Sequence, residues 1–194
     1  VLFAFVTSVT AGPNNMMLLA SGVNFGVRPT VPHMLGISCG HFIMLIAVGL
    51  GLGELFIRMP FIYPMMKVLG MAYMFYLAWG LVRSGALKTQ ASAVNEGAKP
   101  LGFWGAAAFQ WVNPKAWVMT LGYFATYLPQ DAGVALIASA SLVFSLVNLP
   151  CIGAWTLMGA RLRHYLEVGL YRRIFNGTMA LLLVASMAVS LFMR

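Results

Sequence analysis

Two polar clusters, each built around a proline inside an apolar segment, are the strongest candidates for chemistry in this chain. They are Gly12-Pro13-Asn14-Asn15 and Asn113-Pro114-Lys115. A proline ends or kinks a helix, because it lacks the N–H group and its ring clashes with the preceding turn. At membrane depth, a broken helix is tolerated only where it lines a cavity or is buried in protein. Interrupted segments at matching places in two halves of a chain indicate the binding site of a transporter.

Lys115 is the one full charge deep inside any apolar segment of the sequence. Ionisable residues inside a membrane are costly and are therefore candidates for function. Lys115 could attract a carboxylate, or it could lose and regain a proton, because burial favours the neutral form of a lysine. The alternative is that Lys115 binds backbone carbonyls at the break and only stabilises the kink.

Four asparagines are candidates for substrate binding, because an amide side chain both donates and accepts hydrogen bonds. Asn14, Asn15 and Asn113 lie at the two breaks, and Asn148 lies beside Pro150 in a later apolar segment. The alternative for the first three is that they cap backbone groups freed by the prolines, and a capping side chain can also face substrate. Asn148 is predicted to line a cavity at a kink that Pro150 makes in this segment.

His41 is a candidate proton carrier alongside Lys115, and His33 lies two turns earlier on a similar face. The alternative is that His41 is a structural hydrogen-bonding residue. Cys39 and Cys151 fall in the second apolar segment of each half. They could form a redox pair, although buried cysteines commonly behave as small apolar residues.

The elements that position these residues are predicted from composition. The chain has 194 residues, 61% of them hydrophobic and 8% charged, with a mean hydropathy of +0.85. A soluble domain has about 25% charged residues. The solvent is therefore lipid, and at about 20 residues per spanning helix the chain can cross a membrane about six times. The net charge of +8 lies between apolar segments, which indicates membrane orientation and not nucleic-acid binding.

The first predicted span covers about 1–24 and contains Pro13, and the fourth covers about 101–128 and contains Pro114. The first is interpreted as a retained span, because it lacks the basic region of a signal peptide. The basic stretch 161–173 is predicted to lie in the membrane interface. The other spans are predicted at residues 32–53, 61–83, 133–159 and 174–193.

The orientation follows from the basic residues. Eight lie in the loops after spans one, three and five, and three lie on the other side. The richer side is predicted to be cytoplasmic, with both termini periplasmic. The eight are Arg28, Arg83, Lys88, Lys99, Arg161, Arg163, Arg172 and Arg173, and the three are Arg58, Lys67 and Arg194.

Pro13 and Pro114 each break the first span of a three-span half, about a hundred residues apart. Three is an odd number, so the second half enters the membrane in the opposite sense. We predict an all-α membrane protein with six transmembrane helices in two inverted three-helix repeats, with helices 1 and 4 broken at mid-membrane. The repeats are residues 1–83 and 101–194, and a cytoplasmic linker at 84–100 joins them.

This topology places the start of both second half-helices near the midplane, with proline at the first helical position and Gly12 or Asn113 at the cap. A helix start carries unpaired N–H groups and about half a positive charge. Two such ends at one depth favour an anion such as a carboxylate.

The sequence indicates no enzyme, cofactor or metal site. It contains four acidic residues, all in loops or at span ends, which gives no support to paired-carboxylate catalysis. No cluster of metal ligands and no phosphate-binding loop stands out. The acidic residues are Glu54, Glu96, Asp131 and Glu167.

Several motifs carry a resemblance to a known family. Along nearly its whole length the chain resembles the lysine-exporter (LysE/RhtB) family of amino-acid exporters. The resemblance implies six spans in two inverted halves, a bacterial inner membrane, and export of amino acids or related metabolites driven by the proton gradient. The chain has Ala11 where the family usually has proline. The motifs are Gly12-Pro13-Asn14, Gly26-x-Arg28, Gly36-x-x-x-Gly40, Lys67-x-x-Gly70-x-x-Tyr73 leading to Gly80, Asn113-Pro114-Lys115-Ala116, and Arg172-Arg173 with Asn176-Gly177.

We therefore predict a proton-coupled exporter of small amino acids that works by alternating access, with the amino acid, protons and the lipid bilayer as its partners. The cargo is predicted to be neutral, because no acid inside the membrane could hold a cationic side chain. The Gly36-x-x-x-Gly40 and Gly49-x-x-x-Gly53 faces could pack within one chain or across a homodimer. The alternatives are a membrane thiol–disulfide electron carrier, a function of distant structural relatives of the exporters, and a passive channel for small solutes.

Overall fold

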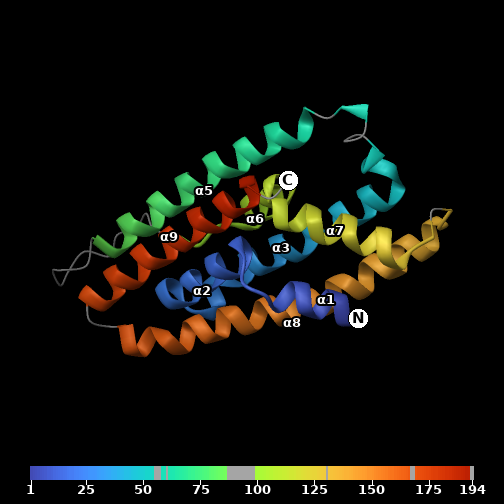
Figure 1. Ribbon diagram of the computed structural model, residues 1–194. Helices are drawn as coiled ribbons and strands as arrows, with labels where there is room; N and C mark the ends of the chain where they lie inside the picture. Colours follow the sequence, from blue (N-terminus) through green and yellow to red (C-terminus); the bar gives the residue numbers. More distant parts are fainter. Residues whose placement is uncertain (55–57, 60, 87–98, 130, 167–168, 193–194) are drawn as a thin grey trace.

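The computed structural model describes residues 1–54, 58–59, 61–86, 99–129, 131–166 and 169–192, and these contain helices and no strands (Figure 1). Most of the predicted linker, with Lys88 and Glu96, lies outside the described residues, as do Glu167 and Arg194. The helices are α1 (Leu2–Val9), α2 (Pro13–Phe25), α3 (Val27–Ala47), the π-helical turn η1 (Val48–Leu52), α5 (Ile62–Ala86), α6 (Phe103–Val112), α7 (Pro114–Tyr127), α8 (Val134–Leu162), the 3₁₀ turn η2 (Arg163–Leu166) and α9 (Gly169–Phe192).

Both predicted breaks are present, with the predicted start chemistry. Helix α2 begins at Pro13 with Gly12 at its N-cap, and α7 begins at Pro114 with Asn113 at its N-cap. Helices α1 and α2 meet at a bend of 56°. Proline at the first helical position costs nothing there, because its missing N–H would have no partner within the helix.

Among the described residues, three helical stretches are long and apolar enough to cross a membrane: 27–52, 64–83 and 134–166. The bent pair α1–α2 is a fourth candidate if it counts as one span. Exposed aromatic side chains on α5, including Phe75, Tyr76 and Trp79, fit a surface that faces lipid. A membrane protein is therefore supported, while the six-span count remains a prediction.

Helix α5 lies beside α9 along its length (Figure 1). Helix α6 lies against α3, where a Cβ added at Gly36 or Gly40 would collide with the backbone of Phe103 or Ala107. The predicted close approach at Gly36-x-x-x-Gly40 is therefore confirmed, and it occurs within this chain.

A second glycine contact joins α2 to α8. A Cβ at Gly22 would collide with the carbonyl oxygen of Thr156, and a Cβ at Gly159 would collide with that of Leu19. Backbones this close leave no room for side chains between the helices. The contact with α8 holds α2, which begins at the first break. The contact with α3 holds α6, which ends at the second break.

The described residues of the basic stretch 161–173 are divided among two helices and a turn, and its place in the membrane interface stays a prediction. Helix α8 continues to Leu162, the turn η2 follows, and α9 begins at Gly169, five residues before the predicted start of the last span. Nothing between Gly169 and Arg173 breaks a helix, since arginine is a good helix former. Arg172 and Arg173 interrupt the apolar pattern from which the last span was predicted, but α9 includes them.

Candidate functional site

The first break leaves carbonyl groups at and just beyond the end of α1 without helical partners, and a side chain from α2 binds two of them. The Asn15 Nδ2 atom donates hydrogen bonds of 2.8 Å to the carbonyl oxygens of Ser8 and Thr10. Asn15 is buried. It therefore supplies donors that the missing helical turn would have provided, as the capping alternative predicted.

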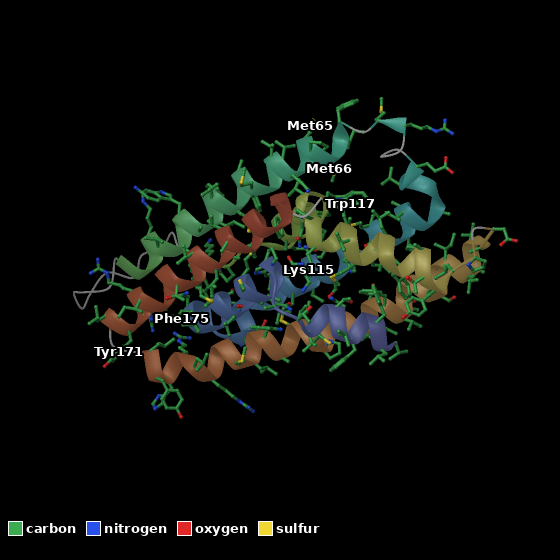
Figure 2. The ribbon with its side chains drawn as sticks, viewed as in Figure 1. Met65, Met66, Lys115, Trp117, Tyr171 and Phe175 are labelled. Atoms are coloured by element: carbon green, nitrogen blue, oxygen red, sulfur yellow. The ribbon has the colours of Figure 1, made fainter. Side chains whose placement is uncertain are left out.

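The Lys115 ammonium group, from the first turn of α7, also binds the first break. Its Nζ atom donates to the Thr10 carbonyl oxygen at 2.7 Å, the Thr10 Oγ1 atom at 3.0 Å and the Ala11 carbonyl oxygen at 3.2 Å. Figure 2 shows Lys115 near the middle of the molecule, away from both ends of the long helices. Lys115 binds carbonyls, as the structural alternative stated, but they belong to the other break, so this side chain connects the two.

Gly12 is the point of closest approach between the two breaks. A Cβ atom at this position would lie 2.6 Å from Lys115 Cδ and 3.0 Å from Nζ. The Gly12 backbone is extended, with φ 179, which any residue can adopt. Glycine is therefore required for space and not for conformation.

Asn14 pairs with Gln110, which lies one turn before the second break. Asn14 Nδ2 donates to Gln110 Oε1 at 2.8 Å, and Gln110 Nε2 donates back to Asn14 Oδ1 at 3.3 Å. Gln110 was missed in the sequence analysis. The signal was available, because it is the one amide side chain in the apolar stretch 103–112 and it is fully buried.

Asn113 caps its own helix. Its Oδ1 atom accepts a hydrogen bond of 3.1 Å from the backbone N–H of Lys115. Asn148 reaches the first break from α8, where its Nδ2 atom donates to Ser8 Oγ at 3.0 Å. Asn148 Oδ1 is buried and has no partner among the described residues. Asn148 therefore has an acceptor free beside the break.

The two histidines of α3 differ in their partners. The His41 Nε2 atom lies 3.1 Å from Thr120 Oγ1 of α7, and its ring packs edge-on against Phe144 at 5.1 Å between centroids. His33 is buried, and neither ring nitrogen has a partner in the part of the chain that the structure describes. His41 is thus held by a hydrogen bond to the second half, whereas His33 has unused hydrogen-bonding capacity.

A cavity of about 30 Å³ lies between the two breaks. It has room for about one or two water molecules, so it is too small for an amino acid. Predicted site residues line it, except for the two prolines. The lining residues are Thr7, Ser8, Gly12, Asn14, Asn15, Ile37, His41, Gln110, Asn113, Lys115, Ala116, Met119, Asn148 and Ile152.

A larger cavity of about 700 Å³ lies toward the end of the molecule where α2 and α5 end and α6 begins. Arg83 and Lys99 line it, together with His33 and mainly apolar side chains. Ile37, one turn after His33 and one turn before His41, lines the smaller cavity and packs with Leu18, Ala106 and Ile152. One face of α3 therefore passes from the large cavity to the small one.

The cysteines lie apart from the breaks. Cys39 is exposed on α3 and Cys151 is buried on α8, and both are free thiols. Neither lines either cavity. The polar groups of the site between the breaks are therefore amides, hydroxyls, backbone carbonyls, the His41 imidazole and the Lys115 ammonium group.

Comparison with known proteins adds a family. The sequence model of the LysE type translocators matches residues 5–194. The chain is 29% identical over 188 residues to a protein of Salmonella choleraesuis (strain SC-B67) named cysteine/O-acetylserine efflux protein, covering 94% of this chain and 90% of the relative. It is 29% identical over 184 residues, with the same shares covered, to the Escherichia coli (strain K12) protein of that name. No solved structure matches the chain.

Proposed function

Because this chain belongs to the LysE type translocators, a family of transporters and not of enzymes, we propose that it exports small neutral amino acids or related metabolites across a bacterial inner membrane. The relatives named for cysteine and O-acetylserine efflux support this class of cargo. Both of those compounds are small α-amino acids with no net charge on the side chain.

The observation that carries the proposal is the contact of the two breaks through Lys115, around a polar cavity. The starts of α2 and α7 each carry about half a positive charge, and the Lys115 ammonium group adds a full one, which favours a carboxylate. The exposed carbonyls at the end of α1 are acceptors for an ammonium group. A zwitterion therefore finds complementary groups at both ends.

The side chains around the two cavities favour a neutral cargo. Neither cavity is lined by an aspartate or glutamate among the described residues. A cationic side chain would have to leave water without a carboxylate to neutralise it, which is costly in a low-dielectric site. We therefore expect free arginine and lysine to compete poorly with neutral amino acids for transport.

The transport cycle we propose is alternating access in a six-span inverted repeat, with both termini periplasmic. A cavity of about 30 Å³ cannot hold the cargo, so a second conformation must open it. In the proposed orientation, the 700 Å³ cavity faces the cytoplasm, and Arg83 and Lys99 at this end would attract carboxylates. Coupling to protons would use Lys115 or His41, the titratable side chains that line the small cavity.

The test is counterflow in proteoliposomes loaded in turn with cysteine, O-acetylserine, threonine, leucine, arginine and lysine. We expect exchange of the neutral compounds, a fall to background in Lys115→Ala, and wild-type rates in the control Lys67→Ala, whose residue lines neither cavity. Full exchange in Lys115→Ala would contradict the site, and preferential exchange of arginine or lysine would contradict the neutral cargo.

Two further arms separate the alternatives. Flux that ignores an imposed pH gradient would replace a coupled exporter with a passive channel. Loss of function when Cys39 and Cys151 are both changed to serine would favour the thiol–disulfide carrier. We expect this double variant to retain the wild-type rate, because neither thiol lines the site.

A further inference from the structure

The Lys115 head group is itself a primary ammonium ion bound to the end of α1. We propose that the Thr10 carbonyl, the Thr10 hydroxyl and the Ala11 carbonyl form a binding site for a primary ammonium group. We further propose that Lys115 fills this site in the empty protein in place of the cargo's amino group. The second part rests on the proposed function, whereas the first does not.

The site has the number and kind of acceptors that a primary ammonium needs. An R–NH₃⁺ group has three N–H donors and no acceptor. Lys115 Nζ has three oxygen acceptors within 3.2 Å, two of them backbone carbonyls. The Thr10 carbonyl also accepts from Asn15 Nδ2 at 2.8 Å, which uses the second of its two lone pairs. The amino group of an amino acid has the same three donors as the lysine head group.

The position on the helix favours a cation. Thr10 is the C-cap of α1, and its N–H donates to the Val6 carbonyl, so the carbonyls of Thr10 and Ala11 lie beyond the last turn of this helix. The C-terminal end of a helix carries the negative end of the helix dipole. Break geometry and electrostatics therefore select the same kind of ligand.

The site is also reachable. Thr10 and Ala11 are exposed, and the lysine that fills the site is attached through a flexible four-carbon chain from another helix. Non-helical backbone at membrane depth is tolerated only where it lines a water-filled cavity or is buried in protein. At the membrane depth proposed for this break, its exposed side would face water or another protein surface, and removal of the lysine would leave a vacant site that a small ion can enter.

Exchange of one ammonium for another gives both ends of the cargo a partner. When the cargo's amino group takes the carbonyls, the displaced Lys115 ammonium is free to bind the cargo's carboxylate. Lys115 is then an internal competitor in the empty protein and a ligand in the loaded one. Free proline as a cargo has a secondary ammonium group with only two N–H donors and would leave one acceptor unfilled. The site therefore favours cargo with a primary amino group.

The test is thermal unfolding of purified full-length protein in detergent, with methylammonium chloride as the probe. Lys115→Ala and Lys115→Met are compared with wild type, since methionine keeps most of the side-chain length and guards against a packing defect. We expect a saturable rise in Tm for both variants and none for wild type, whose site is already filled. Tetramethylammonium chloride at equal concentration, which has no N–H donor, should give no rise.

Two outcomes would overturn the site: equal shifts in wild type and in the variants, or equal shifts with the two salts. Adding Thr10→Val to Lys115→Met removes the hydroxyl acceptor and should weaken the methylammonium response several-fold. The assay needs no transport. A rise in Tm with methylammonium in the Lys115 variants, without amino-acid exchange by wild type, would support the ammonium site and contradict the exporter. Amino-acid exchange by wild type, without that rise in Tm in the variants, would support the exporter and contradict the ammonium site.

Discussion

The two breaks start their second helices in the same way but satisfy their backbones differently. The second break is a single residue long, and Asn113 caps the new helix with its own side chain. The first leaves three residues, 10–12, outside any helix, and Gly12 has no side chain to form a cap. Its carbonyls instead bind Asn15 from α2 and Lys115 from the other half of the chain.

This difference indicates that the second break is the more rigid of the two and that the first can change its hydrogen bonds. At the second break, Asn113 accepts from the Lys115 N–H and Trp117 Nε1 donates to the Trp111 carbonyl, so both contacts stay within a few residues of the break. A break satisfied by a distant ammonium group changes its hydrogen bonds whenever that group moves. In the transport cycle proposed above, the first break is therefore the one expected to rearrange, while the second positions Lys115.

The largest expected contrast is between two asparagine truncations. Asn15→Ala leaves the Ser8 carbonyl, and one lone pair of the Thr10 carbonyl, without a buried partner, which should lower the free energy of unfolding by about 2 kcal/mol. Asn113→Ala removes one helix cap and should lower it by about 1 kcal/mol. Denaturant unfolding in detergent measures both. A larger loss of stability in Asn113→Ala than in Asn15→Ala would contradict the inference that the first break rearranges and the second does not. As a control, Asn113→Ser should restore most of the cap.

A methyl group at Gly12 tests the contact without removing any polar group. Gly12→Ala should displace the Lys115 side chain, because the new Cβ would lie 2.6 Å from Cδ. We expect roughly tenfold slower counterflow, equivalent to about 1.4 kcal/mol, with little change in Tm, since a flexible side chain can move aside. The matched control is Gly122→Ala in α7, where the nearest atom, Phe3 Cζ, is at an ordinary 3.6 Å. Wild-type transport in Gly12→Ala would show that Lys115 need not reach Thr10.

The smallest expected effect is the coupling between Asn14 and Gln110. This pair joins α2, which follows the first break, to α6, which precedes the second. A double-mutant cycle with Asn14→Ala and Gln110→Ala should give a coupling of about 1 kcal/mol in unfolding free energy. Additive losses would show that the two amides act independently. The pair Asn24→Ala and Asn176→Ala is a suitable comparison, because the same kind of amide pair joins α2 to α9 away from the site.

Local chemistry explains what could be predicted. Proline with an adjacent cap residue identifies a helix start from neighbouring residues alone, so both breaks were found. Lys115 was found because a charge in an apolar segment needs a reason. Its partners could not be predicted, since Thr10 lies 105 positions away in the chain and only packing brings the two together.

Other misses follow the same logic. Gln110 stands out in the sequence as the one amide in the apolar stretch 103–112, but its partner, Asn14, lies 96 positions away and only packing reveals the pair. The start of α9 was placed too late because charges in the first turns masked a helix that the backbone continues. Periodicity and composition describe a helix by its side chains, whereas its ends depend on hydrogen bonds that side chains do not reveal.

The small volume of the cavity between the breaks bears on whether protons could leak through the protein. A membrane holds its proton gradient only if its carriers do not leak while idle. About 30 Å³ of polar space, adjoined by the apolar contact of Leu18, Ile37, Ala106 and Ile152, is too little for a continuous file of water along which protons could hop. In the exporter proposed above, this conformation would therefore offer protons no continuous water path between the two breaks.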